Sequence, residues 1–174
     1  MVGAAVDLYW LPLGAGGWFV RRNGWVYERV AAWVARREPL DLYHAALEVR
    51  VGSDVFVIEQ TPVRDRHGAD RGVVGEGPVG ARWAGRVRIF RYEVRCWRDG
   101  VIPDIAEAVD SPRRVSDDRA VAQRVLDAVH DVPLRTWGRD ELRAGEMWNS
   151  NAVIAWVLRH GGIDAASITP PAGG

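Results

Sequence analysis

The segment that most constrains the fold is residues 42–61, which read as two strands joined by a tight turn. Residues 42–51 (LYHAALEVRV) and 55–61 (VFVIEQT) flank the turn-forming residues Gly52, Ser53 and Asp54. Apolar runs separated by such residues predict a β-hairpin. A turn centred near Gly52 and Ser53 places position 44 opposite position 61, and position 46 opposite position 59.

The hairpin should have one apolar and one polar face, because alternate residues of a strand point to opposite sides. The apolar face, which we expect to meet the core, contains Ala45, Leu47, Val49, Val51, Phe56, Ile58 and Gln60. The polar face, which we expect to border a groove or solvent, contains His44, Ala46, Glu48, Arg50, Val57, Glu59 and Thr61. A register slip of one residue would exchange the two faces.

The remaining elements follow from periodicity and from turn residues. We expect strands at 6–13 and 86–97, helices at 24–37, 117–130 and 150–160, and a long loop at 62–80. Ser116 is the expected cap of the second helix, and Gly161 and Gly162 end the third. The strand at 86–97 carries Arg86, Arg88, Arg91 and Arg95, which should form a solvated face or meet an acidic partner. Strands and helices in separate runs predict an α+β fold, with an antiparallel sheet packed with helices.

Composition narrows the class of protein. The 174 residues fit one domain, which we place at 1–166, followed by a flexible Pro/Gly tail at 167–174. Arginine supplies all 23 cations and balances 23 carboxylates, so nothing indicates a nucleic-acid binder. We expect no transmembrane segment, because no apolar run approaches the roughly 20 residues needed to span a bilayer. A lone cysteine, no metal-ligand spacing and no signal peptide favour a cytoplasmic protein without metal or cofactor.

His44 and Glu59 are the first candidate site residues. They share the polar face at a diagonal spacing of about 7–8 Å between backbones, which long side chains can close. A histidine oriented by a carboxylate is the base of many nucleophilic sites. The alternative is a histidine held in a surface ion pair.

Ser150 is the candidate nucleophile, because it opens the last helix. Free backbone N–H groups and the positive end of the helix dipole favour a nucleophile there, and the same groups can hold an oxyanion. Trp148, Asn149 and Asn151 flank it as candidate substrate-binding residues. The alternative is that Asn149 or Ser150 is only the helix cap. Cys96 is a rival nucleophile, although its place on a strand better suits a small buried residue.

A family resemblance joins these two segments. The stretch 148–158 (WNSNAVIAWVL) resembles the helix-opening motif of circularly permuted papain-like proteins, the permuted NlpC/P60 families that include the lecithin retinol acyltransferase and PPPDE groups. Residues 43–49 (YHAALEV) resemble their histidine strand, and Glu59 falls where a third polar residue is expected. The resemblance implies a hydrolase or acyltransferase acting on an amide or ester-type bond, without a cofactor.

Ser150 departs from the family, which has cysteine there. A hydroxyl is far less acidic than a thiol, so Ser150 needs His44 as a true general base. Ser150 is then a genuine serine nucleophile, a replacement that inactivates a cysteine site, or the mark of a domain that kept only a binding groove. The substrate is a peptide, a lipid or another acyl or amide group, or the partner is a peptide or protein held without catalysis. A structural component of a larger assembly is a third possibility, and the sequence leaves the oligomeric state open.

Overall fold

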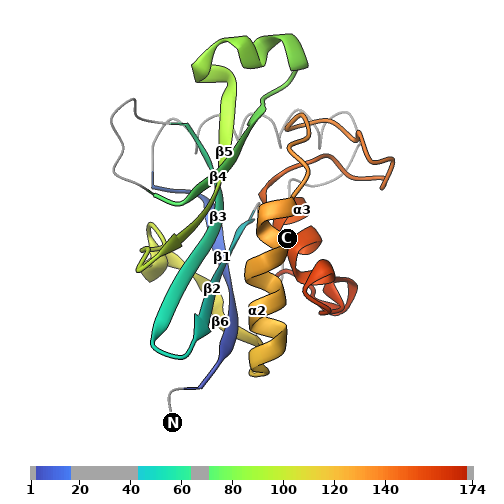
Figure 1. Cartoon of the computed structure of the whole chain (residues 1–174). Helices are drawn as coiled ribbons and strands as arrows, with labels where there is room; N and C mark the ends of the chain where they lie inside the picture. The colour runs from blue at the N-terminus through green and yellow to red at the C-terminus, as the bar shows by residue number, and fades with distance from the viewer. Residues whose placement is uncertain (1–2, 17–42, 64–70, 172–174) are drawn as a thin grey trace.

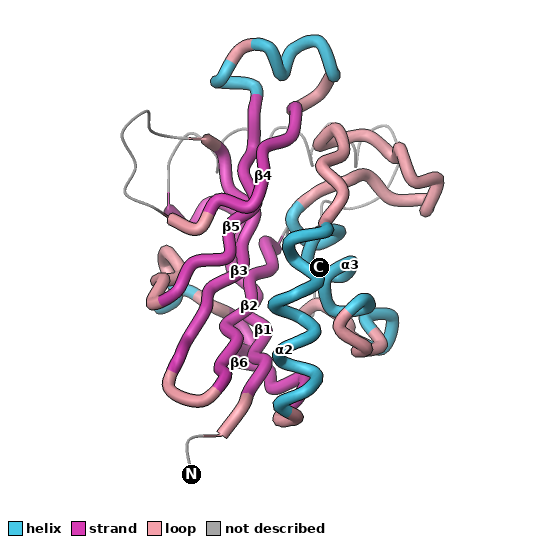
Figure 2. Tube along the Cα trace, in the orientation of Figure 1, coloured by secondary structure: helices cyan, strands magenta, loops and turns pink. Residues whose placement is uncertain are grey.

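The computed structural model describes residues 3–16, 43–63 and 71–171, which form a six-stranded sheet with helices on one side (Figures 1 and 2). The strand order is β4-β5-β3-β2-β1-β6, and every neighbouring pair is antiparallel. The strands are β1 (Ala5–Gly16), β2 (Tyr43–Val51), β3 (Asp54–Pro62), β4 (Val73–Pro78), β5 (Arg91–Arg98) and β6 (Val109–Ser116). The α+β class with an antiparallel sheet is confirmed. The helix predicted at 24–37 lies outside the described residues.

The β2–β3 hairpin has the predicted register. Leu47 pairs with Ile58 and Val51 pairs with Asp54, which is the offset that sets position 44 against position 61. Gly52 closes the turn with a φ of 63°, a left-handed conformation that glycine adopts without steric cost.

The apolar face of the hairpin packs under two helices, α2 (Arg119–Ala128) and α3 (Ser150–His160). Leu47 and Ile58 join one buried cluster with Val125 of α2 and Val157 of α3. Figure 2 shows both helices on the same side of the sheet. This face therefore forms the main core, as the sequence predicts.

The opposite face is also buried in part, so the expectation of an open polar face is wrong at Ala46 and Val57. Both residues are buried in a second cluster with Tyr9, Leu11 and Ile102. Ile102 belongs to the connection between β5 and β6, which packs against this face. A strand buried on both sides does not show clean apolar and polar alternation.

The helix ends are set by side-chain caps. Asp118, and not Ser116, caps α2, because its carboxylate accepts a hydrogen bond from Val121 N at 2.9 Å. Ser116 Oγ accepts instead from Asp118 N at 3.2 Å. The predicted α3 is confirmed from Ser150 to His160, with Gly161 following its last turn.

The chain between 62 and 98 differs from the prediction at two places. The expected loop contains strand β4, whose glycines allow close packing: a Cβ on Gly77 would lie 2.3 Å from the Tyr92 ring. The expected strand at 86–97 begins only at Arg91, because β4 ends at Pro78 and its pairing with β5 stops at Pro78–Arg91. The residues before Arg91 form short 3-10 helices at Arg82–Arg86 and Arg88–Phe90.

Three more 3-10 turns complete the described structure. They lie at Ile105–Glu107, Val129–Asp131 and Ala165–Ser167.

Candidate functional site

The sheet opens between β2 and β3 at one end. Their mutual pairing runs from the turn to Leu47–Ile58. Beyond that pair, β2 stays paired with β1 as far as Tyr43, while β3 stays paired with β5 as far as Pro62. We call residues 43–46 and 59–62 the fork. Its two arms expose backbone groups that need partners from elsewhere in the chain.

Asn151, in the first turn of α3, supplies those partners for β2. Its side-chain amide donates to Tyr43 O and accepts from Ala45 N, both at 3.0 Å. The first turn of α3 is therefore held against the backbone on both sides of His44. Backbone hydrogen-bonding groups of a strand lie in the plane of the sheet, so the Asn151 amide lies in that plane.

Asn149 takes the capping role that the sequence leaves open between Asn149 and Ser150. Its side chain accepts a hydrogen bond from Ala152 N at 2.8 Å. Ser150 is thus the first residue of the helix, and its hydroxyl does not cap the helix. No hydrogen bond between described residues uses the backbone N–H of Ser150 or Asn151, which are two of the donors that a helix N-terminus leaves open.

Trp148 anchors the same end of α3 from the other side. It is only 4% exposed, and its indole Nε1 donates to Tyr92 Oη at 3.1 Å. Tyr92 Oη in turn donates to Arg135 O at 2.7 Å. Of the three predicted substrate-binding residues, Trp148 lies in the core, Asn149 caps the helix and Asn151 holds β2.

His44 lies on the arm of the fork that Asn151 holds. Burial lowers the pKa of its imidazole to about 4, so the ring is neutral at physiological pH. Strand alternation points the ring toward the face of Ala46, whereas α3 packs on the face of Ala45. No hydrogen bond between described residues joins His44 to the Ser150 hydroxyl.

Glu59, the predicted orienter of His44, lies on the other arm. The predicted approach assumed that β2 and β3 stay paired at positions 44–61 and 46–59, but their pairing ends before those positions. The carboxylate of Glu59 is 3.1 Å from Arg95 Nη1, and Arg95 also pairs with Glu93. All three side chains are nearly fully buried, which corrects the expected solvated position of Arg95.

Gln60 is a polar residue that the sequence analysis assigned only to the core face. It is 5% exposed, and within the described structure neither its amide oxygen nor its amide nitrogen has a hydrogen-bond partner. It pairs with Val94 of β5 and, by the hairpin register, faces Ala45 across the fork. A buried amide without partners is costly, so this one is a candidate for binding a ligand. In the sequence, Gln60 is the one polar residue on a predicted strand face that is otherwise apolar.

The other candidates do not form a site. Burial raises the pKa of Cys96 to about 11, which disfavours the thiolate that a nucleophilic cysteine needs. The described residues contain no group of three or more His, Cys, Asp or Glu side chains able to hold a metal ion.

A scan against family models, a search of curated proteins and a search of solved structures found no match. Across the described ranges, no helix is long and apolar enough to cross a bilayer.

The buried charges predict a strong effect of Arg95 on stability. Arg95→Leu leaves Glu59 and Glu93 as buried carboxylates without their cation. We expect the free energy of unfolding to fall by about 3–5 kcal/mol in urea titrations. Arg98→Ala is the matched control, because its pair with Asp54 is largely exposed and should contribute less than about 1 kcal/mol. An Arg95→Leu protein as stable as the control would refute this account.

The buried imidazole predicts a pH-dependent stability. The unfolded chain binds a proton at His44 near pH 6.5, whereas the folded protein does so only near pH 4. Unfolding therefore takes up a proton between these values, and stability falls as the pH is lowered through them. At about 1.4 kcal/mol per pH unit the loss reaches about 3 kcal/mol. His44→Phe should show a shallower fall over this range in urea titrations at stepped pH; identical slopes would contradict the burial of the ring.

Proposed function

We propose that the protein is a hydrolase or acyltransferase of circularly permuted papain-like architecture, with Ser150 as nucleophile and His44 as base. The observation that carries the proposal is the Asn151 amide, which bonds to the backbone on both sides of His44. Asn149 meanwhile caps the helix and leaves the Ser150 hydroxyl without that task. A hydroxyl at a helix N-terminus and a neutral imidazole are the two groups that an activated serine needs, provided that they meet in the substrate complex.

The level at which α3 meets the sheet supports an approach between the two side chains. Because the Asn151 amide lies in the plane of β2, the first turn of α3 reaches into the sheet at the fork and does not stack above it. Ser150 precedes Asn151, which places its backbone next to the β2 segment that carries His44. The mechanism requires a rotation of the imidazole or of Ser150 χ1 that brings the ring and the hydroxyl together in a substrate complex.

The chemistry needs only groups of this chain. Ser150 Oγ attacks the acyl carbon of an amide, ester or thioester while His44 takes its proton. The tetrahedral intermediate collapses, and the imidazolium returns the proton to the departing amine, alcohol or thiol. Water or an acceptor alcohol or amine then attacks the acyl-serine, again with His44 as base, and releases Ser150.

Two kinds of donor are available for the oxyanion. The backbone N–H groups of Ser150 and Asn151 are the first, because Asn149 Oδ1 already occupies the N–H of Ala152. The amide of Gln60 is the second, because it is buried at the other arm of the fork and lacks a partner. Binding a substrate carbonyl would satisfy this amide, which explains why a polar group is kept at a core position.

An introduced thiol tests the environment of position 150 without knowledge of the substrate. In a Cys96→Ser background, Ser150→Cys should carry a thiol whose pKa lies at least about one unit below the ordinary 8.5. The pH dependence of iodoacetamide alkylation measures it. His44→Ala in the same background should raise this pKa, because the thiolate loses the N–H group that a neutral imidazole can donate to it. A thiol pKa of 8.5 or above that ignores His44 would remove both residues from a catalytic role.

A fluorophosphonate probe tests the native serine. Wild type should gain the mass of one phosphonyl group in intact-protein mass spectrometry, and Ser150→Ala should not. Gln60→Leu keeps the volume but removes the amide, so labelling should slow by about tenfold or more. Cys96→Ser is the matched control and should label like wild type. Equal labelling of wild type and Ser150→Ala would exclude Ser150 as the nucleophile.

A second candidate function is a papain-like module that binds a peptide or protein without catalysis. The pairing of Glu59 with Arg95 favours it, because that carboxylate is already committed to a cation. This candidate predicts an ordinary thiol pKa at position 150 and no phosphonylation. The two experiments above therefore separate it from the enzyme.

A further inference from the structure

The segment between β4 and β5 forms an exposed projection that the proposed reaction does not use. We call residues 81–90 the tip. Figure 1 shows it extending past the end of the sheet, away from the body formed by the sheet and helices. Its two short 3-10 helices close on themselves through Val87 N to Ala84 O at 2.9 Å and Phe90 N to Val87 O at 3.0 Å.

The tip carries large apolar side chains on its outside. Trp83 is 75% exposed and Ile89 is 78% exposed, and Val87 and Phe90 are also exposed. These residues are four of the nine exposed large hydrophobic side chains among the described residues, although the tip is only a short part of that chain. Such clustering is unusual for a free surface and marks a place of contact.

The charge of the tip has one sign. Residues 79–92 contain four arginines, Arg82, Arg86, Arg88 and Arg91, and no acidic residue. Arg86 and Arg88 are exposed and alternate with Val87 and Ile89. Arg82 pairs with Glu141 and Arg91 pairs with Glu76, so two of these four charges are balanced by carboxylates of neighbouring segments.

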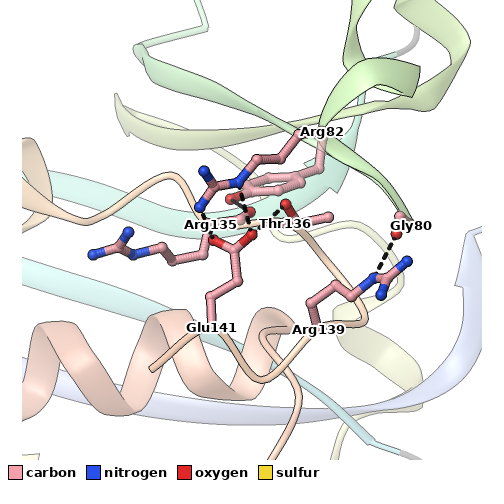
Figure 3. Close-up of polar contacts among 7 residues, drawn as sticks. Gly80, Arg82, Arg135, Thr136, Arg139 and Glu141 are labelled. Atoms are coloured by element: carbon pink, nitrogen blue, oxygen red, sulfur yellow. Dashed lines mark hydrogen bonds and ion pairs between the residues drawn. The ribbon is translucent and has the colours of Figure 1, made fainter. Parts of the chain in front are cut away.

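Hydrogen bonds attach the base of the tip to residues 136–141. Arg82 makes two hydrogen bonds to Glu141, at 3.0 and 3.2 Å, and Thr136 Oγ1 donates to the same carboxylate at 2.8 Å (Figure 3). These contacts lower the pKa of Glu141 to about 2, so the carboxylate stays charged at physiological pH. Arg139 Nε donates to Gly80 O at 2.8 Å beside them.

We propose that the tip docks on an anionic phospholipid surface. Trp83, Ile89 and their apolar neighbours enter the interface between headgroups and acyl chains, where tryptophan and aliphatic side chains are favoured. Arg86 and Arg88 pair with headgroup phosphates, and the tip itself contains no acidic residue to repel the negative surface. A narrow convex tip suits a deformable bilayer better than a folded partner, whose specific interfaces need a broad complementary patch.

Docking would also fix the orientation of the candidate site relative to the membrane. Trp137 N donates to Pro78 O and Gly80 N donates to Trp137 O, which joins the base of the tip to the segment before α3. Trp148 continues this link through hydrogen bonds with Gly138 and Arg139. The tip and the N-terminus of α3 are therefore parts of one connected end of the molecule. The docking itself does not depend on Ser150 being a nucleophile.

Vesicle co-sedimentation of the full chain tests the proposal. Wild type should sediment with vesicles of phosphatidylcholine and phosphatidylglycerol in equal amounts, at least tenfold more tightly than with phosphatidylcholine alone. Binding should weaken as sodium chloride is raised. Trp83→Ala with Ile89→Ala, and separately Arg86→Glu with Arg88→Glu, should each weaken binding at least tenfold.

Matched controls lie elsewhere on the surface. Val101→Ala with Leu142→Ala removes exposed apolar side chains outside the tip, and Arg119→Glu with Arg143→Glu makes the same charge change at exposed positions. Both controls should bind like wild type, and circular dichroism should show all variants folded. Loss of binding in the controls, equal binding to neutral and anionic vesicles, or no binding by wild type would overturn the proposal. So would a wild-type dimer in sedimentation velocity that Trp83→Ala with Ile89→Ala converts to a monomer without any vesicle binding.

Discussion

The two hydrogen bonds from the Asn151 side chain are the interaction on which the arrangement of the molecule depends. A sheet that opens between two inner strands leaves backbone groups without partners inside the protein, and such groups destabilise the fold unless other donors and acceptors replace the lost ones. Asn151 replaces them for β2 with a group of the same chemistry as a peptide bond. The fork and the position of α3 therefore depend on each other, because Asn151 of α3 supplies the hydrogen bonds that the β2 backbone needs at the fork.

The two arms of the fork are held in different ways. The β2 arm is held through its backbone by a neutral amide from a helix, whereas the β3 arm carries buried side-chain ion pairs in which Arg95 lies between Glu59 and Glu93. Buried ion pairs contribute little net stability but fix geometry, since any rearrangement leaves a charge unpaired. This gives the β3 arm, and with it Gln60, a rigid position opposite α3.

The sequence predicted what depends on near neighbours and missed what depends on distant ones. The offset of the β2–β3 hairpin follows from its turn, and the limits of α3 follow from Asn149 and Gly161, so both were predicted correctly. The end of the β2–β3 pairing depends on Asn151, which is more than a hundred residues from Ala45 in the chain. The predicted approach of His44 to Glu59 assumed that β2 and β3 are paired at these positions, and they are not. The glycines of β4 were assigned to a loop because the Tyr92 ring that packs on Gly77 cannot be foreseen locally.

The low pKa of His44 sets a demanding condition for the proposed serine chemistry. A cysteine site works best as a thiolate beside an imidazolium, and an imidazole with a pKa of about 4 would hold that proton poorly. A serine site instead needs a base that is unprotonated before the reaction begins, and burial keeps His44 in that form throughout the physiological range. The weak basicity of such an imidazole must be offset by strong stabilisation of the oxyanion, which is the part that the open helix N–H groups and the unpartnered amide of Gln60 are suited to supply. The proposed serine mechanism therefore depends on its oxyanion donors more than on the basicity of His44.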